Sequence, residues 1–395
     1  MTSYLAQQFL NGVQLGTIYA LIALGYTMVY GIIKLINFAH ADIFMVGAYV
    51  AFFLVAYITG ISANIPLQLS IWPAVIISYL LLGFFSTNIP YFRKIFDSFE
   101  LHAQDHKKRF GSHMYPYLIL IAKAGIQVIV LLILTAVIAP ILFGITTTFF
   151  KLPLSWLAIP AIIAYVMAIC ALLGCAMEKI AYRPLRHKPR LSALITAMGV
   201  SFFLENFCSL DLMFSNKYQA FPILVNKIDI LNIEALGISI NNIFIINIVV
   251  LAVMLAVLWF LVEKTLIGKQ MRAVAFDVKT ASLMGIDVDR IISVTFMIGP
   301  AFAGVSGVLY AMNYGVLQSP FLGFFPGLKA FIAAVLGGKG NLPGAVLGAF
   351  LMGTTEVFAN AIDSNLGFAA AFMVLIIILL IKPTGILGKK EIEKV

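Results

Sequence analysis

Three polar side chains interrupt an otherwise apolar stretch at residues 35–52, which reads LINFAHADIFMVGAYVAF. Asn37, His40 and Asp42 lie close together there, where a membrane helix would normally exclude such groups. The first N–H groups of a helix have no partner within it, and Asn or Asp side chains often accept hydrogen bonds from them. We predict that Asn37 or Asp42 caps a helix that begins here. Direct contact of these three residues with a transported molecule is the alternative interpretation.

Two carboxylates lie inside apolar runs, Glu205 in VSFFLENFCSL and Glu356 in GTTEVFAN. A charged residue at the centre of a membrane helix costs roughly 2.5–3.5 kcal/mol on insertion scales, so such residues usually face a cavity or a partner. Each carboxylate therefore has two interpretations, an interhelical hydrogen bond or contact with a substrate. Glu205 could also be protonated, or could bond its neighbour Asn206.

A glycine-rich stretch, GGKGNLPG at residues 337–344, separates two short apolar runs. Single glycines often serve only to let helices pack closely. The cluster as a whole favours a broken or re-entrant helix near 323–344, where exposed N–H groups and a positive dipole end would suit a substrate carboxylate. The residues that define the break are Gly337, Gly338, Gly340 and Asn341.

Residues 264–290, KTLIGKQMRAVAFDVKTASLMGIDVDR, mix basic, acidic and small side chains. A loop that only fixed the topology would need no more than its basic charges. Small residues at helical spacing, with Lys, Arg and Asp over the remainder, favour a short helix along the membrane face. We interpret this segment as a docking surface for a soluble partner.

Motifs for catalysis are missing from the sequence. The chain lacks GxxxxGK[ST], HExxH and GxSxG, so it has no P-loop for ATP and no zinc-protease or hydrolase signature. Its cysteines, Cys170, Cys175 and Cys208, all fall inside apolar runs, which argues against a disulfide framework or a metal site. We expect no catalytic residue, cofactor or metal in this chain.

The composition identifies a polytopic membrane protein. Apolar residues make up 62% of the 395 residues and charged residues 11%, against about 45–50% and roughly 25% in soluble domains. The mean hydropathy is +1.02. Lys and Arg total 26 against 17 acids. In a membrane protein this excess indicates basic cytoplasmic loops rather than nucleic-acid binding.

Apolar runs near the roughly 20 residues needed to cross a bilayer recur along the chain and predict an all-α bundle of about 9–11 spans. The candidate spans are 9–30, 41–60, 66–88, 117–145, 153–177, 191–212, 242–263, 291–312, 323–338, 343–360 and 367–382. We treat residues 1–395 as a single transmembrane domain.

Basic loops set the predicted orientation. Residues 178–190 and 264–290 are rich in Lys and Arg, which places them in the cytoplasm together with the C-terminus, while loop 213–241 and the N-terminus lie outside. The three polar residues at 37–42 would then sit at the cytoplasmic junction of the first two spans. Residues 61–150 fit this orientation as an inserted helical hairpin, whose two spans start and end outside and whose charged loop lies in the cytoplasm.

Several stretches together resemble one family, the LivH-type permease subunit of the bacterial ABC importer for branched-chain amino acids. The resemblance covers about three quarters of the chain, in order, and continues into the tail KPTGILGKKEIEKV. The matching stretches are NGVQLGTIYALIALGYTMVYGIIKLINFAHADIFMVGAYV, EKIAYRPLR, LITAMGVSFFLEN, GKQMRAVAFDVKTASLMGIDVDRIISVTFMIG and LGGKGNLPGAVLGAF.

The resemblance implies a multi-pass subunit of the bacterial inner membrane that is not itself an enzyme. It implies a second, LivM-like permease, two cytoplasmic ATPase subunits that supply the ATP hydrolysis, and a periplasmic binding protein that delivers leucine, isoleucine or valine. Residues 264–290 would be the coupling segment seated on an ATPase subunit, and Gly285 would end its helix in a left-handed cap. The residues expected at that contact are Arg272, Asp277, Thr280, Ala281, Ser282 and Gly285.

Other functions stay open on the sequence alone. Related ABC permeases import urea, amides or other amino acids. An ion-coupled secondary transporter would instead use an intramembrane acid such as Glu205, and a channel would need no ATPase partner. The polar residues described above, from Asn37 to Glu356, would line the translocation pathway in the importer.

Overall fold

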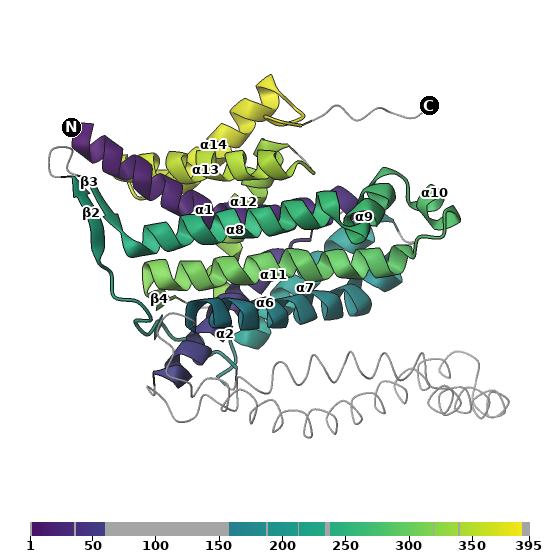
Figure 1. The fold of residues 1–395 in the computed structure, drawn as a ribbon, viewed down its shortest axis with the longest axis horizontal. Coiled ribbons are helices and arrows are strands. Elements are labelled where there is room, and N and C mark those ends of the chain that lie inside the picture. Colours follow the sequence, from purple (N-terminus) through teal and green to yellow (C-terminus); the bar gives the residue numbers. More distant parts are fainter. Residues whose placement is uncertain are drawn as a thin grey trace. The chain divides into compact units, whose positions relative to one another are not determined.

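The computed structural model describes residues 2–34, 37–59, 158–186, 189–211, 213–233, 238–318, 320–338 and 340–388. These residues belong to one compact unit, which Figure 1 shows to be built mainly of long helices. The α-helices are α1 (Thr2–Ile33), α2 (His40–Ile58), α6 (Ala158–Met177), α7 (Arg190–Cys208), α8 (Asn242–Lys264), α9 (Leu266–Phe276), α10 (Val278–Leu283), α11 (Val288–Tyr314), α12 (Phe324–Gly337), α13 (Leu342–Ile362) and α14 (Leu366–Ile381). The predicted hairpin at 61–150, with its spans 66–88 and 117–145, lies outside the described residues.

The predicted helical bundle is confirmed. Every candidate span that falls in the described residues corresponds to a helix whose bounds lie within a few residues of the predicted ones, except that α1 begins at Thr2 rather than at Phe9. Among these residues, 6 helices are long and apolar enough to cross a membrane, and α2, α12 and α14 are shorter apolar helices. The chain is therefore a multi-pass membrane protein.

Helix α2 packs against α11 and α6 and is buried along the length from His40 to Ala56. Close approach of small residues makes this possible. A methyl group on Gly47 of α2 would lie 2.6 Å from the Cα of Gly304 in α11, and one on Gly12 of α1 would lie 2.6 Å from the Cα of Thr354 in α13. Such contacts let helices associate where lipid offers no hydrophobic driving force.

Short strands gather at one end of the helices. β2 (Asp229–Ile233) pairs antiparallel with β3 (Ile238–Asn241), and β1 (Gln219–Ala220) pairs with β4 (Val316–Leu317). The N-terminal end of α1 lies with the β2–β3 hairpin, where the Ser239 N–H donates to Gln7 Oε1 at 3.0 Å. Figure 1 shows α9 and α10 at the opposite end of the long helices.

Helix α6 continues past its predicted end. A π-helical turn, Glu178–Tyr182, and a 3₁₀ turn, Arg183–Leu185, follow it directly. The basic stretch predicted as a loop at 178–190 is thus helical over much of its length. Isolated π turns inside helices are rare and often lie at functional sites.

Candidate functional site

The start of α2 lies deep in the bundle rather than at a junction on its surface. The rings of His40 and Tyr26 are 4.6 Å apart, and His40 leaves no room for a side chain at Gly25. Gly25 also meets the backbone of Gly299, in the middle of α11. At 1.5 Å of rise per residue, this level is about 12 Å inward of the end of α1. The start of α2 therefore lies within the bundle, and the cytoplasmic side expected for this junction stays a prediction.

Asn37 makes a contact other than the predicted cap. Its Oδ1 accepts a hydrogen bond from the Tyr182 hydroxyl at 2.5 Å, so this side chain joins the turn before α2 to the π turn after α6. The first N–H groups of α2 donate to backbone oxygens instead, for example His40 N to Asn37 O at 3.1 Å. Asp42, in the first turn of α2, interacts with Ser201 and Glu205 of α7 and with its own backbone N–H. The capping hypothesis was wrong for Asn37.

Asp42 and Glu205 face each other across α2 and α7. Both are buried, and their carboxyl groups interact electrostatically. The two carboxyl groups share a hydrogen bond, and Asp42 also interacts with Ser201 of α7. A hydrogen bond between two carboxyl groups requires a shared proton, so this arrangement differs from an ion pair. The structure thus brings His40, Asp42 and Glu205 into one polar region around the start of α2.

Glu356 has partners that satisfy it. Lys329 of α12 donates to Glu356 Oε1 at 2.5 Å, and the Tyr19 hydroxyl of α1 donates to Oε2 at 2.8 Å. The set therefore joins α1, α12 and α13, as the interpretation of an interhelical bond predicted. Lys329 was missed in the sequence, although a single cation inside a candidate span is a signal for a buried ion pair.

The predicted helix break is confirmed between α12 and α13. Gly338 and Gly340 have φ of +116° and +80°, which favour glycine, and Asn341 caps α13 by accepting from Gly344 N at 3.2 Å. The C-terminal segment covers the break. Leu387 N donates to Gly337 O at 3.0 Å, and Asn341 Nδ2 donates to Leu387 O at 2.7 Å. Contact of this break with a substrate carboxylate stays a prediction.

Helix α12 is also short, in agreement with the predicted interruption. It has 14 residues, which extend about 21 Å against the roughly 30 Å of a hydrocarbon core. A 3₁₀ turn, Pro320–Gly323, precedes it and packs on α2. Gly323 and Gly327 pack so closely against Ala41 of α2 that neither position has room for a side chain.

The segment 264–290 forms two helices, α9 and α10, rather than one. Asp277 separates them and caps α10 by accepting from Lys279 N at 2.9 Å and Thr280 N at 3.1 Å. At the other end of α10, Gly285 has φ +81°. Ile286 N donates to Ala281 O at 3.1 Å and Gly285 N to Ser282 O at 3.0 Å, which is the Schellman pattern. The predicted left-handed cap at Gly285 is confirmed.

The exposed surface of α10 is more apolar than the sequence indicated. Leu283 and Met284 are 87% and 79% exposed, and Phe276 is 79% exposed. Ala281, which the sequence placed at the surface, is buried within the chain. Of the other predicted contact residues, Thr280, Ser282 and Gly285 are exposed, Asp277 is half-buried, and Arg272 is exposed beside Glu263 at 3.3 Å.

A charged set that the sequence did not identify as a unit lies beside this segment. Glu178, fully buried in the π turn, pairs with Arg186 and accepts from the Ser293 hydroxyl at 2.6 Å. Arg183 and Arg186 both pair with Asp289 in the first turn of α11, Arg183 at 2.5 Å. The sequence had suggested only that the arginines set topology.

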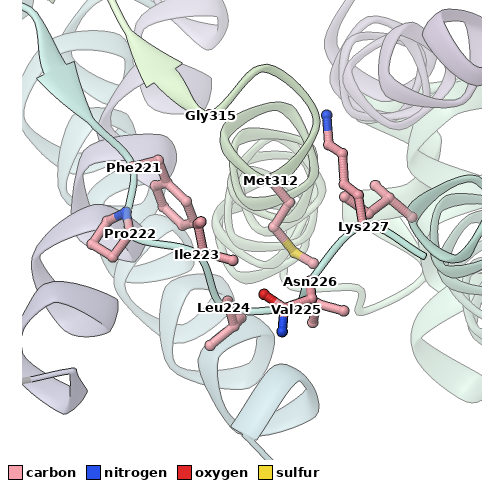
Figure 2. Close-up of a pocket in the computed structure, with 10 residues that line it drawn as sticks. Phe221, Pro222, Ile223, Leu224, Val225, Asn226, Lys227, Met312 and Gly315 are labelled. Atoms are coloured by element: carbon pink, nitrogen blue, oxygen red, sulfur yellow. The ribbon is translucent and has the colours of Figure 1, made fainter.

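A hollow of about 290 Å³ lies at the end of α11 near the short strands. Figure 2 shows Met312 extending from α11 toward the loop that carries Phe221 and Lys227. The Lys227 ammonium donates to Asn313 O at 3.1 Å. A second hollow, of about 240 Å³, lies between α1, α12 and α14 next to Tyr26. Among the described residues, no group of three His, Cys, Asp or Glu could hold a metal.

Comparisons with known proteins agree on one family. The profile of the branched-chain amino acid transport system permease component matches residues 8–96 and 110–381. The branched-chain amino acid permease LivH of Salmonella typhimurium is 35% identical over 99% of this chain and 98% of its own length, and BraD of Pseudomonas aeruginosa is 34% identical over 98% and 97%. The guanosine ABC transporter permease NupP of Bacillus subtilis is 27% identical over 32% of this chain and 36% of its own. No solved structure matches the chain.

Proposed function

The chain belongs to the family of branched-chain amino acid permease components of ABC transporters, and we propose that it forms one half of an importer for leucine, isoleucine and valine. The observation that supports this substrate class is the similarity, over nearly the full length of the chain, to permeases named for branched-chain amino acids. ABC permeases are membrane subunits rather than enzymes, so the free energy for transport comes from ATP hydrolysed elsewhere in the complex.

The coupling segment, residues 264–290, is the proposed contact with a cytoplasmic ATPase subunit. Three large apolar side chains, Phe276, Leu283 and Met284, are exposed on it beside basic residues. Exposed apolar groups with a polar rim are typical of protein interfaces. The cap at Gly285 gives α10 a defined end, so the segment can transmit a push as a rigid piece.

The complex that we propose contains further subunits. A second, LivM-like permease completes the channel, and two ATPase subunits bind on the side of α10. A periplasmic binding protein delivers cargo at the opposite end, where the β2–β3 hairpin lies. In this arrangement the protein spans the bacterial inner membrane, and its C-terminus is cytoplasmic.

The translocation pathway passes the start of α2. Asn37, His40 and Asp42 lie there, with Glu205 close to Asp42. Polar groups buried at this depth in a membrane protein commonly mark the path of a substrate. The glycine break and Glu356 belong to the same pathway only if cargo reaches α12 and α13, and the partners of Glu356 favour a structural role for it.

The proposal is tested by purifying the tagged chain from its native membrane in mild detergent and identifying its partners by mass. Two ATPase subunits and a second permease are the expected result. A lone oligomer without an ATPase would overturn the coupling assignment. Reconstituted with its binding protein, the complex should import labelled leucine but not urea, and the opposite result would change the substrate class.

A further inference from the structure

The buried carboxylate Glu178 ties two distant parts of the chain together. It lies in the π turn after α6 and is fully buried, and it meets Arg186 and the Ser293 hydroxyl, the latter at 2.6 Å. Removing one member of a buried pair leaves an uncompensated charge, so the partners hold each other firmly. The π turn and α11 are therefore fixed to each other at this point.

The same set reaches the exit of the coupling segment. Asp289 pairs with Arg186 and Arg183, and Asp287, just before it, caps α11 by accepting from Arg290 N at 3.0 Å. Only three residues, 284–286, separate Asp287 from the end of α10. A displacement of α10 would therefore first move the start of α11, where Arg183 and Arg186 bind Asp289.

The π turn also reaches the deep start of α2. Tyr182 lies in this turn, where its ring contacts that of Phe296 of α11 at a centroid distance of 5.2 Å, and its hydroxyl donates to Asn37 Oδ1 at 2.5 Å. Asn37 in turn offers its backbone oxygen to His40 N at 3.1 Å. Direct contacts therefore run without a gap from the end of α10 to the first residue of α2.

We infer that Glu178, Arg186, Asp289 and Tyr182 are positioning residues that transmit motion of the coupling segment to the start of α2. This inference rests on the proposed function, since it requires an ATPase to move α10. The arginines hold the start of α11 to the π turn, and Tyr182 holds the π turn to the chain before α2. A push on α10 then moves the polar region around His40 and Asp42 together with the cytoplasmic end of the bundle.

The test measures amino acid imported per ATP hydrolysed by the reconstituted complex with its binding protein. Tyr182→Phe removes only one hydroxyl group, and Tyr19→Phe is its matched control, because Tyr19 is also buried and donates to a side-chain oxygen, Glu356 Oε2, at 2.8 Å. We expect Tyr182→Phe and Arg186→Gln to lower the ratio by about tenfold, which corresponds to about 1.4 kcal/mol of coupling free energy. Tyr19→Phe should leave the ratio unchanged.

The outcomes separate the inference from the function on which it rests. A wild-type complex without an ATPase subunit overturns the proposed function itself. A complex that assembles and hydrolyses ATP, but keeps the wild-type ratio in both variants, overturns the inference alone. If Arg186→Gln fails to accumulate, Tyr182→Phe decides. Equal losses in Tyr182→Phe and Tyr19→Phe would mark both hydroxyls as folding elements and also overturn the inference.

Discussion

Glu178 and Glu356 are both buried carboxylates that meet a cation and a hydroxyl group, yet their surroundings differ. Glu356 is bound by Lys329 and Tyr19 in a closed set between three helices, with little exposure for any member. The set around Glu178 is open, because it continues to Asp289, whose side chain is 50% exposed beside the coupling segment. This difference indicates that a closed set can hold helices together, whereas an open set can link a surface segment to the interior.

Breaking the closed pair should have the largest effect on stability. Lys329→Met leaves Glu356 buried without its cation, and such losses cost about 3–5 kcal/mol. We expect the protein level in the membrane to fall sharply. The double variant Lys329→Met/Glu356→Leu removes both charges and should recover most of it, measured as membrane level and thermal unfolding in detergent. A single variant as stable as wild type would contradict a structural role for this pair.

Straining the coupling segment should abolish transport while sparing the fold. Gly285 has φ +81°, where a side chain costs roughly 1–2 kcal/mol, and a bulky group there would also stand on the proposed docking surface. Gly285→Leu should lose nearly all leucine uptake at a normal membrane level. The matched control is Gly315→Leu, because Gly315 has φ +68° and open space, but lies at the other end of α11. Equal uptake by the two variants would contradict a role of the coupling segment in transport.

A charge on the apolar tip of α10 should weaken ATPase binding without strain. Leu283→Asp places a carboxylate where the side chain is 87% exposed, so folding should tolerate it. A carboxylate that becomes buried without a partner in an apolar contact is costly, so we expect a clear loss of the ATPase subunit from pull-downs. Leu231→Asp, on the β2–β3 hairpin, is the control and should retain the ATPase. Retention by both variants would count against the docking surface.

Removing the charge of Glu205 should have the smallest effect. Glu205→Gln keeps the size of the side chain and can still form a hydrogen bond with Asp42, so ATP-driven uptake should stay within about twofold of wild type. Uptake should also persist when the proton gradient is dissipated while ATP remains. Collapse of uptake in Glu205→Gln, or on loss of the proton gradient, would support ion coupling through Glu205. Its pairing with Asp42 would then have a role different from the structural sets around Glu178 and Glu356.

Local features could be predicted from the sequence. Hydropathy located the helices, and the glycine cluster at 337–344 located the break, because both depend on nearby residues. Gly285 was assigned its cap for the same reason, once the resemblance had placed a helix before it. The exposure of Leu283 and the burial of Ala281 were missed, because they depend on how α10 packs against its neighbours.

Features that depend on packing between helices could not be predicted. The depth of His40 follows from the contacts of Gly25 and Gly47 with other helices, which no local pattern contains. The pairing of Glu356 with Lys329 and of Glu178 with Arg186 also requires the arrangement of the bundle. The polar stretch at 37–42 shows the same limit. Its residue types marked it as a site of interest, but its contacts depend on helices that are distant in the sequence.

The most direct test of the account is a photoreactive residue at position 284, cross-linked in native membranes. Met284 is 79% exposed at the tip of α10, and a probe at the exposed Leu231 serves as the control. We expect a covalent adduct from position 284 whose added mass is that of an ABC ATPase subunit, and none from position 231. An adduct of position 284 with lipid alone, while the complex still imports leucine, would contradict the claim that this segment receives the power stroke.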